Sequence, residues 1–158
     1  MTSMIVGKNV YWSKKYEPIV NRLTGKDRED KKRSFETNMD VLVFAAVLGI
    51  KEGASEKVAS DRLEISIDVF NNRKMFGVIY LIGLLHTKDA NVLRQEREGE
   101  MIAIFQDYAM GGLNLIEAWL DEQPTDLYGD KILLEKIHNE LVKGKASDFT
   151  GAVGAVSF

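Results

Sequence analysis

The stretch that decides the fold is MIAIFQDYAMGGLNLIEAWL, residues 101–120. Its apolar residues recur with the period of an α-helix and predict one long helix with a single apolar stripe. That stripe consists of Met101, Ile104, Phe105, Tyr108, Leu113, Ile116, Trp119 and Leu120. The helical pattern extends over residues 91–122, and Pro124 ends it.

Two adjacent glycines, Gly111 and Gly112, interrupt the stripe in the middle of this predicted helix. A glycine in a helix interior costs about 1 kcal/mol relative to alanine. A sequence that accepts this cost twice indicates either a kink or a close helix crossing at which no side chain fits.

Outward from this helix, the pattern predicts further helices at residues 16–23, 39–48, 73–86 and 126–142, with a strand as the alternative for 73–86 because of its β-branched residues. The second of these has Thr37 or Asn38 as its N-cap and stops at Gly49. Residues 1–15 are expected to be irregular. The fold class is therefore all-α, a compact bundle of about five helices. One short extended segment near residues 63–70 remains an alternative to helix, because apolar and polar residues alternate there.

Length and composition indicate one domain. The chain has 158 residues, no cysteine and a net charge of -3, which excludes a disulfide framework and a largely disordered chain. We expect a single helical domain over residues 1–145 with a basic N-terminal arm (1–36), followed by an apolar small-residue tail over residues 146–158. The longest apolar runs are far shorter than the ~18 residues that cross a bilayer, and no signal-peptide pattern is present. A cytoplasmic protein without membrane contacts is expected.

The small net charge hides an asymmetry. Residues 1–36 carry nine Lys and Arg against five Asp and Glu, a net +4, and the remaining residues carry 12 against 19, a net -7. Such asymmetry favours nucleic-acid binding through the arm or head-to-tail association of two copies. The candidate nucleic-acid contacts are Lys26, Arg28, Lys31, Lys32 and Arg33. The candidate interface residues of the tail are Val153, Val156 and Phe158. We expect a homo-oligomer.

No residue set predicts catalysis, and no catalytic, cofactor-binding or metal-binding residues are assigned. His86 and His138 have no partner at metal-binding spacing, and cysteine is absent. Glu96, Glu100 and Asp107 share a helical face but lack the Glu-x-x-His pairs of di-metal bundles. The faintest alternative is a metal-dependent nuclease, for which the candidate residues are Asp61, Glu64, Asp68 and Lys74.

Two stretches resemble a known family when they are taken together. The first is DVLVFAAVLG, residues 40–49, and the second is IFQDYAMGGL, residues 104–113. Over about residues 35–120 their order and spacing resemble the small proteins associated with Dnd (DNA phosphorothioation) systems of bacteria. Gln106 and Met110 differ from the family pattern, which has an acid and a polar residue there.

The resemblance implies a role in bacterial defence against foreign DNA, together with partner proteins, and supplies no catalytic residues. Its signature positions would be Tyr108, Gly111 and Gly112, where a helix crossing is the simplest explanation. The sequence thus favours a non-enzymatic accessory or adaptor protein of a DNA modification–restriction system without a cofactor. A nucleic-acid-binding module is the alternative, with DNA as its partner.

Overall fold

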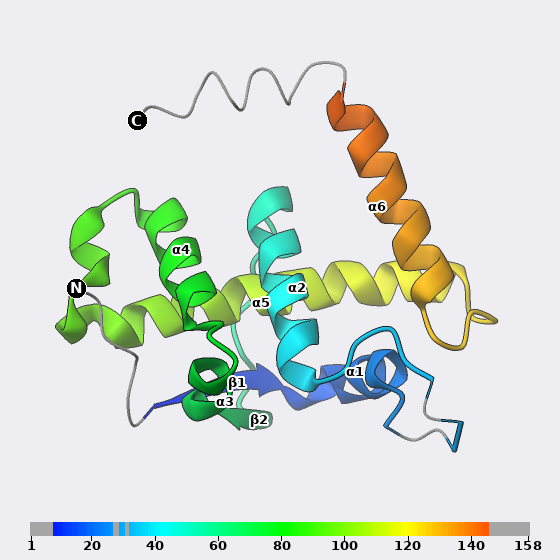
Figure 1. The fold of residues 1–158 in the computed structure, drawn as a ribbon, viewed down its shortest axis with the longest axis horizontal. Helices are drawn as coiled ribbons and strands as arrows, with labels where there is room; N and C mark the ends of the chain where they lie inside the picture. The colour runs from blue at the N-terminus through cyan, green and yellow to red at the C-terminus, as the bar shows by residue number, and fades with distance from the viewer. Residues whose placement is uncertain (1–7, 27–28, 31, 146–158) are drawn as a thin grey trace.

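The structure is a computed structural model that describes residues 8–26, 29–30 and 32–145 (Figure 1). Its helices are α1 (Glu17–Thr24), α2 (Asn38–Glu52), α3 (Ile67–Asn72), α4 (Phe76–Thr87), α5 (Glu98–Glu122) and α6 (Asp130–Lys145). Two strands, β1 (Asn9–Ser13) and β2 (Arg62–Ser66), form a small antiparallel sheet, and three short 3₁₀ helices are η1 (Lys14–Tyr16), η2 (Ala90–Leu93) and η3 (Gln95–Arg97). The predicted all-α fold is confirmed in part, because the described residues are mostly helical but include this two-stranded sheet.

The long helix α5 is the centre of the molecule. It runs unbroken through Gly111 and Gly112, so these glycines introduce no helix break. Figure 1 shows α2 crossing α5. Helix α6 and the C-terminal ends of α2 and α4 lie on one side of α5, whereas the sheet, α1 and α3 lie on the other side. One hydrophobic cluster joins these elements, and its largest fully buried side chains include Trp12, Tyr16, Phe70 and Phe105.

Helix α2 begins and ends at specific caps. The Thr37 side chain accepts a hydrogen bond from the Asp40 N–H, and the Asp40 carboxylate accepts one from the Thr37 N–H, which makes a complete capping box. The predicted stop at Gly49 is wrong. The helix continues to Gly53, which has a φ of 67° and closes it in the left-handed conformation. Gly49 lies inside the helix. The residue is a glycine because the backbone of α5 passes too close to leave room for a side chain.

The sheet is the main departure from the predicted fold. Residues 9–13 form β1 instead of an irregular segment, and Val10 and Trp12 are buried on its inner face. Its partner β2 spans only the first part of the alternating segment, and residues 67–72 form α3. The pairing joins Val10 to Ile65, more than fifty positions away, so no local pattern around residue 10 reports it.

The second edge of β1 lies against α5. The Tyr11 N–H donates a hydrogen bond to Gln106 Oε1 over 2.8 Å, and the Ser13 N–H lies 3.2 Å from Met110 Sδ. An edge strand leaves its backbone groups unpaired unless another element covers them. Gln106 and Met110 thus accept hydrogen bonds at the edge of β1 that β2 leaves open.

The last two helices start later than predicted. Residues 90–97 form η2 and η3 before α5 begins, and the Asp89 side chain accepts a hydrogen bond from the Asn91 N–H at the start of this segment. Helix α6 begins after a turn at Gly129, whose φ is 75°. There the Asp126 carboxylate accepts a hydrogen bond from the Ile132 N–H over 2.9 Å. In both cases an aspartate side chain accepts a backbone hydrogen bond in the segment that precedes the helix.

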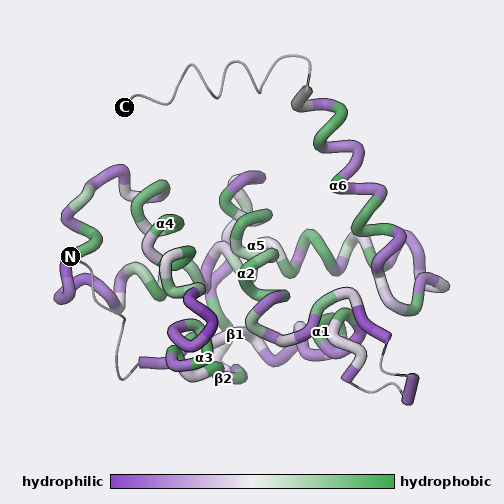
Figure 2. The backbone as a smooth tube through the Cα atoms, viewed as in Figure 1, coloured by the Kyte–Doolittle hydropathy of each residue, from purple (hydrophilic) through white to green (hydrophobic). Residues whose placement is uncertain are grey.

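Helix α6 packs on the rest of the protein mainly through its first turns. Ile132 and Leu133 are buried, whereas Leu134, Ile137, Leu141 and Val142 are exposed. Figure 2 shows hydrophobic and hydrophilic residues alternating along this helix as it extends away from α5.

Among the described residues, no helix combines the length and the apolar character that a membrane span requires.

Candidate functional site

The predicted signature glycines lie where α5 crosses α2. A Cβ atom built on Gly112 would lie 1.8 Å from the carbonyl oxygen of Ala45, and one built on Gly111 would lie 2.1 Å from the carbonyl oxygen of Ala54. Gly49 of α2 makes the reciprocal approach, with a built Cβ 2.1 Å from the Tyr108 carbonyl oxygen. Real Cβ atoms do not come this close to backbone, so the crossing requires glycine at all three positions.

Tyr108 takes part in the helix crossing through its backbone and in a polar contact through its side chain. Its backbone lies against Gly49, and its hydroxyl lies 2.6 Å from Nδ1 of His86 on α4. The two rings meet edge to face at a centroid distance of 5.4 Å. His86 therefore ties α4 to α5 beside the crossing. His138, the other histidine, lies on α6, where it is exposed.

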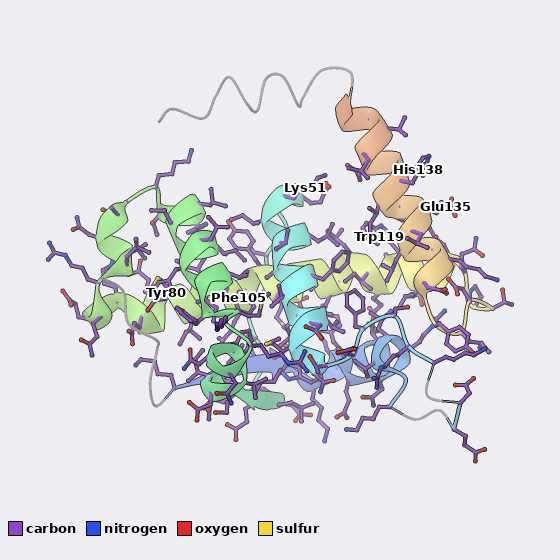
Figure 3. All side chains as sticks on the ribbon, in the orientation of Figure 1. Lys51, Tyr80, Phe105, Trp119, Glu135 and His138 are labelled. Carbon is purple, nitrogen blue, oxygen red and sulfur yellow. The ribbon has the colours of Figure 1, made fainter. Side chains whose placement is uncertain are left out.

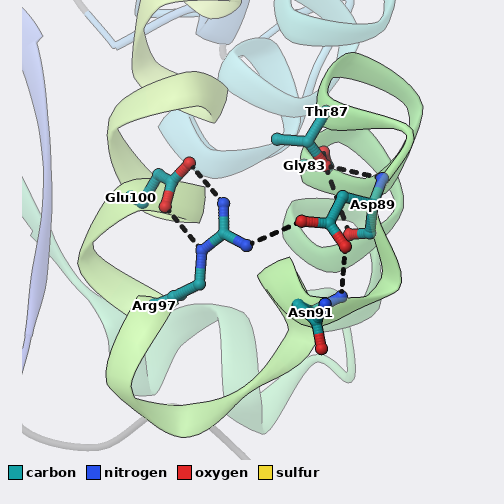
Figure 4. Close-up of polar contacts among 6 residues, drawn as sticks. All are labelled: Gly83, Thr87, Asp89, Asn91, Arg97 and Glu100. Atoms are coloured by element: carbon teal, nitrogen blue, oxygen red, sulfur yellow. Dashed lines mark hydrogen bonds and ion pairs between the residues drawn. The ribbon is translucent and has the colours of Figure 1, made fainter.

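A charged network joins the end of α4 to the start of α5 (Figure 4). The Arg97 guanidinium donates to both oxygens of Glu100 over 2.8 Å and to Asp89 over 3.1 Å. Hydrogen bonds from Arg97 hold the pKa of Glu100 below its usual value. The Asn91 backbone N–H, followed by Arg97, lowers the pKa of Asp89. This network organises the turn between the two helices.

The acidic residues that the sequence singled out do not converge. Glu100 is held by Arg97, and Asp107 forms an ion pair with Lys57 at 2.6 Å. Glu64 on β2 accepts a hydrogen bond from the Asn9 side chain, and Asp68 lies in the first turn of α3. In the ranges that the structure describes, no three Asp, Glu or His side chains are arranged to hold a metal ion.

The basic arm is described only in part. Lys26, Lys32 and Arg33 are exposed in the segment between α1 and α2, and Arg28 and Lys31 lie outside the described residues. The tail residues Val153, Val156 and Phe158 also lie outside them. The structure therefore leaves both candidate sets as predictions.

Sequence reasoning missed an apolar groove between α2, α5 and α6, here called the α6 groove. It is lined by Phe44, Val47 and Leu48 of α2, Trp119 of α5, and Ile137 and Leu141 of α6, and it has a volume of about 200 Å³. Figure 3 shows Trp119 between α2 and α6. The ion pair from Lys51 to Glu140, 2.9 Å long, links α2 and α6 at the rim. The available signal was the spacing of Ile137 and Leu141, which lie one helical turn apart on α6.

Further large apolar side chains are exposed on the same side of α5. Leu81 and Leu85, one helical turn apart on α4, are 54% and 53% exposed. On α6, Leu134 is 66% exposed. Gatherings of exposed apolar side chains are typical of interaction sites.

Comparisons with known proteins place this architecture in a family. Neither the curated proteins nor the solved structures include a significant match to the chain. A family model does match, over residues 9–150, which contain every described helix and strand. The chain therefore belongs to the family described as DNA sulphur modification system-associated protein 4.

Proposed function

We propose that the protein is a non-catalytic accessory component of a bacterial DNA modification and defence system that acts by binding other proteins of that system. Membership of a family associated with DNA sulphur modification supplies the context. The observation that carries the proposal is the pair of large apolar side chains, Leu81 and Leu85, that is exposed on α4.

The exposed leucines of α4 make the strongest case. Leu81 and Leu85 lie at i and i+4 and therefore share one helix face. Burying a leucine side chain contributes about 1.5–3 kcal/mol, so these residues forgo that stabilisation in the isolated chain. A partner that covers the α4 face would recover it.

The acidic residues support a binding role over a catalytic one. The side chains that could serve acid–base chemistry, Glu100 and Asp107, are each engaged by a cation within 2.8 Å. The hydrogen bonds from Arg97 lower the pKa of Glu100 and so favour its charged form. These ion pairs brace helix ends and loops.

The test is capture of identified system proteins from the native host or from a co-expressed modification operon. The tagged chain should retain at least one of them, and Leu81→Glu with Leu85→Glu should abolish that retention by placing charges on the α4 face. The matched control is Val69→Glu, an exposed apolar position on α3, across α5 from this face. Equal retention by all variants, or none by the native chain, would contradict the proposal.

The alternative function, a nucleic-acid-binding module, is favoured by the exposure of Lys26, Lys32 and Arg33. Contacts to phosphates would make affinity fall steeply with salt, with a slope set by the number of phosphates neutralised. Anisotropy titrations of labelled duplex DNA should then show weaker binding for Lys32→Gln with Arg33→Gln. An absence of binding at low salt would exclude this alternative.

A further inference from the structure

The α6 groove is an apolar site without an occupant among the described residues. Its two walls carry exposed apolar side chains: Val47 of α2 is 48% exposed, and Leu141 of α6 is 68% exposed. Two exposed ion pairs hold α6 beside this groove: Lys51–Glu140 joins it to α2, and Lys136–Glu122 joins it to α5. Exposed ion pairs of this kind contribute about 0–1 kcal/mol, so they position α6 only weakly.

The groove has the size of one large side chain. An engineered apolar cavity of about 150 Å³ takes up a benzene ring, and the α6 groove measures about 200 Å³. Trp119, one of its lining residues, is partly buried. An aromatic side chain that entered it would pack against this indole and against the aliphatic walls.

The chain itself continues from the rim of this groove. Helix α6 is described as far as Lys145, one turn beyond Leu141, which is about 6 Å along the helix axis. Four residues of extended chain reach about 13–14 Å. Phe149 can therefore turn back to the level of Leu141. The family match also extends beyond α6 to residue 150 and so includes Phe149.

The composition of residues 146–158 suits the groove. The segment ASDFTGAVGAVSF has one charged residue, Asp148, and its large apolar residues are Phe149, Val153, Val156 and Phe158. Its glycines and alanines permit close approach to a helix surface. A segment of this composition gains little from exposure to water and gains free energy by covering apolar surface.

We propose that residues 146–158 fold back on the α6 groove of their own chain, with the Phe149 ring between α2 and α6. This contact clamps the exposed half of α6 to α2. It is independent of the accessory role, because it concerns contacts within one chain and leaves Leu81 and Leu85 of α4 uncovered.

Cross-linking tests the proposal directly, because the chain has no cysteine of its own. Val47→Cys with Thr150→Cys places one thiol on the groove wall and one beside Phe149. A short bismaleimide should join them within one chain about tenfold faster than in the control pair Leu81→Cys with Thr150→Cys. Adding Phe149→Ala to the first pair should reduce its rate to that of the control.

Each other outcome overturns the proposal. Equal rates in the two pairs would mean that the segment has no preference for the groove. A covalent dimer in place of a cross-linked monomer would mean that the groove receives a second copy. A rate that is insensitive to Phe149→Ala would remove the phenyl ring as the anchor.

Trp119 fluorescence gives an independent measurement on the full chain. Deletion of residues 146–158 and the single change Phe149→Ala should both shift its emission to the red and increase quenching by acrylamide. The second tryptophan, Trp12, is buried in the sheet and supplies a constant background. Emission and quenching that stay unchanged in both variants would contradict the proposal.

Discussion

Gly112 of α5 lies directly on the Ala45 carbonyl of α2, and a Cβ at position 112 would lie 1.8 Å from that oxygen. Close approach is possible only because one partner has no side chain. The contact joins the two helices that form the centre of the molecule.

We predict that Gly112→Ala destabilises the protein by at least about 3 kcal/mol, since either the helices separate or the backbone shifts. The matched control is Gly99→Ala in the same helix, where a built Cβ meets nothing within 4 Å. Because Gly99 lies in the first turn of α5, that change should alter the stability by less than about 1 kcal/mol. Urea unfolding followed by circular dichroism measures both. Similar effects of the two changes would contradict the crossing argument.

The hydrogen bond from the Tyr11 N–H to Gln106 makes a second prediction. Gln106→Leu removes the acceptor at the edge of β1 and should cost about 1–3 kcal/mol, because the partly buried N–H loses its partner. Gln106→Glu keeps an acceptor oxygen and should cost less than half as much in urea unfolding at neutral pH. If the leucine variant proved as stable as the native chain, solvent would be satisfying this strand edge.

Tyr16 predicts a dependence of stability on alkaline pH. Its pKa is raised first by burial and then by its hydrogen bond to Glu56, over 2.6 Å. A tyrosine whose folded-state pKa exceeds the unfolded value of about 10 stabilises the fold below that value, and the contribution is lost as pH rises above it. The difference in unfolding free energy between the native chain and Tyr16→Phe should therefore shrink between about pH 10 and 12. A constant difference over that window would contradict the assignment.

The Arg97 network predicts a dependence of stability on acidic pH, with the opposite sign. The pKa values of Asp89 and Glu100 are lowered, so their stabilising effect is present above the unfolded values of about 3.9 and 4.3 and is lost as pH falls below them. Arg97→Gln should lower the melting temperature slightly at pH 7, and the difference from the native chain should shrink as the pH falls below about 4. Because these groups are exposed, salt should also diminish it. A difference that persists at low pH and high salt would point to packing instead.

Self-association remains a prediction from the charge asymmetry and from the apolar residues of the C-terminal part. Light scattering of the full chain should give a mass above that of one protomer. Leu134→Asp, which places a charge on the exposed part of α6, should lower that mass. A monomer mass for the native chain at high concentration would contradict the expectation.

Several parts of the fold follow from local patterns. The stripe from Met101 to Leu120 predicted α5, the run of apolar residues after Asp40 predicted α2, and Gly111 with Gly112 indicated a kink or a close crossing. Each signal lies within one helix, where period and cap chemistry are set by near neighbours in the sequence.

The strand β1 and the α6 groove depend on residues that are distant in the sequence. Nothing local pairs Val10 with Ile65, and nothing in α6 alone shows that Leu141 stays exposed beside Val47. Likewise, Gly49 looks like the end of a helix in the sequence, yet it lies inside α2. Glycine is required there because α5 crosses α2 at this point and leaves no room for a side chain.

The sequence by itself determined the helical class, the main helices, the position of the glycine pair and the resemblance to a family, because periodicity and residue type encode these directly. Only the tertiary structure decided which glycines meet which carbonyls, how the edge of β1 is satisfied and where apolar surface remains exposed. The physical reason is that helix formation depends on neighbours three or four positions away, whereas packing depends on elements that the chain brings together from fifty or more positions apart.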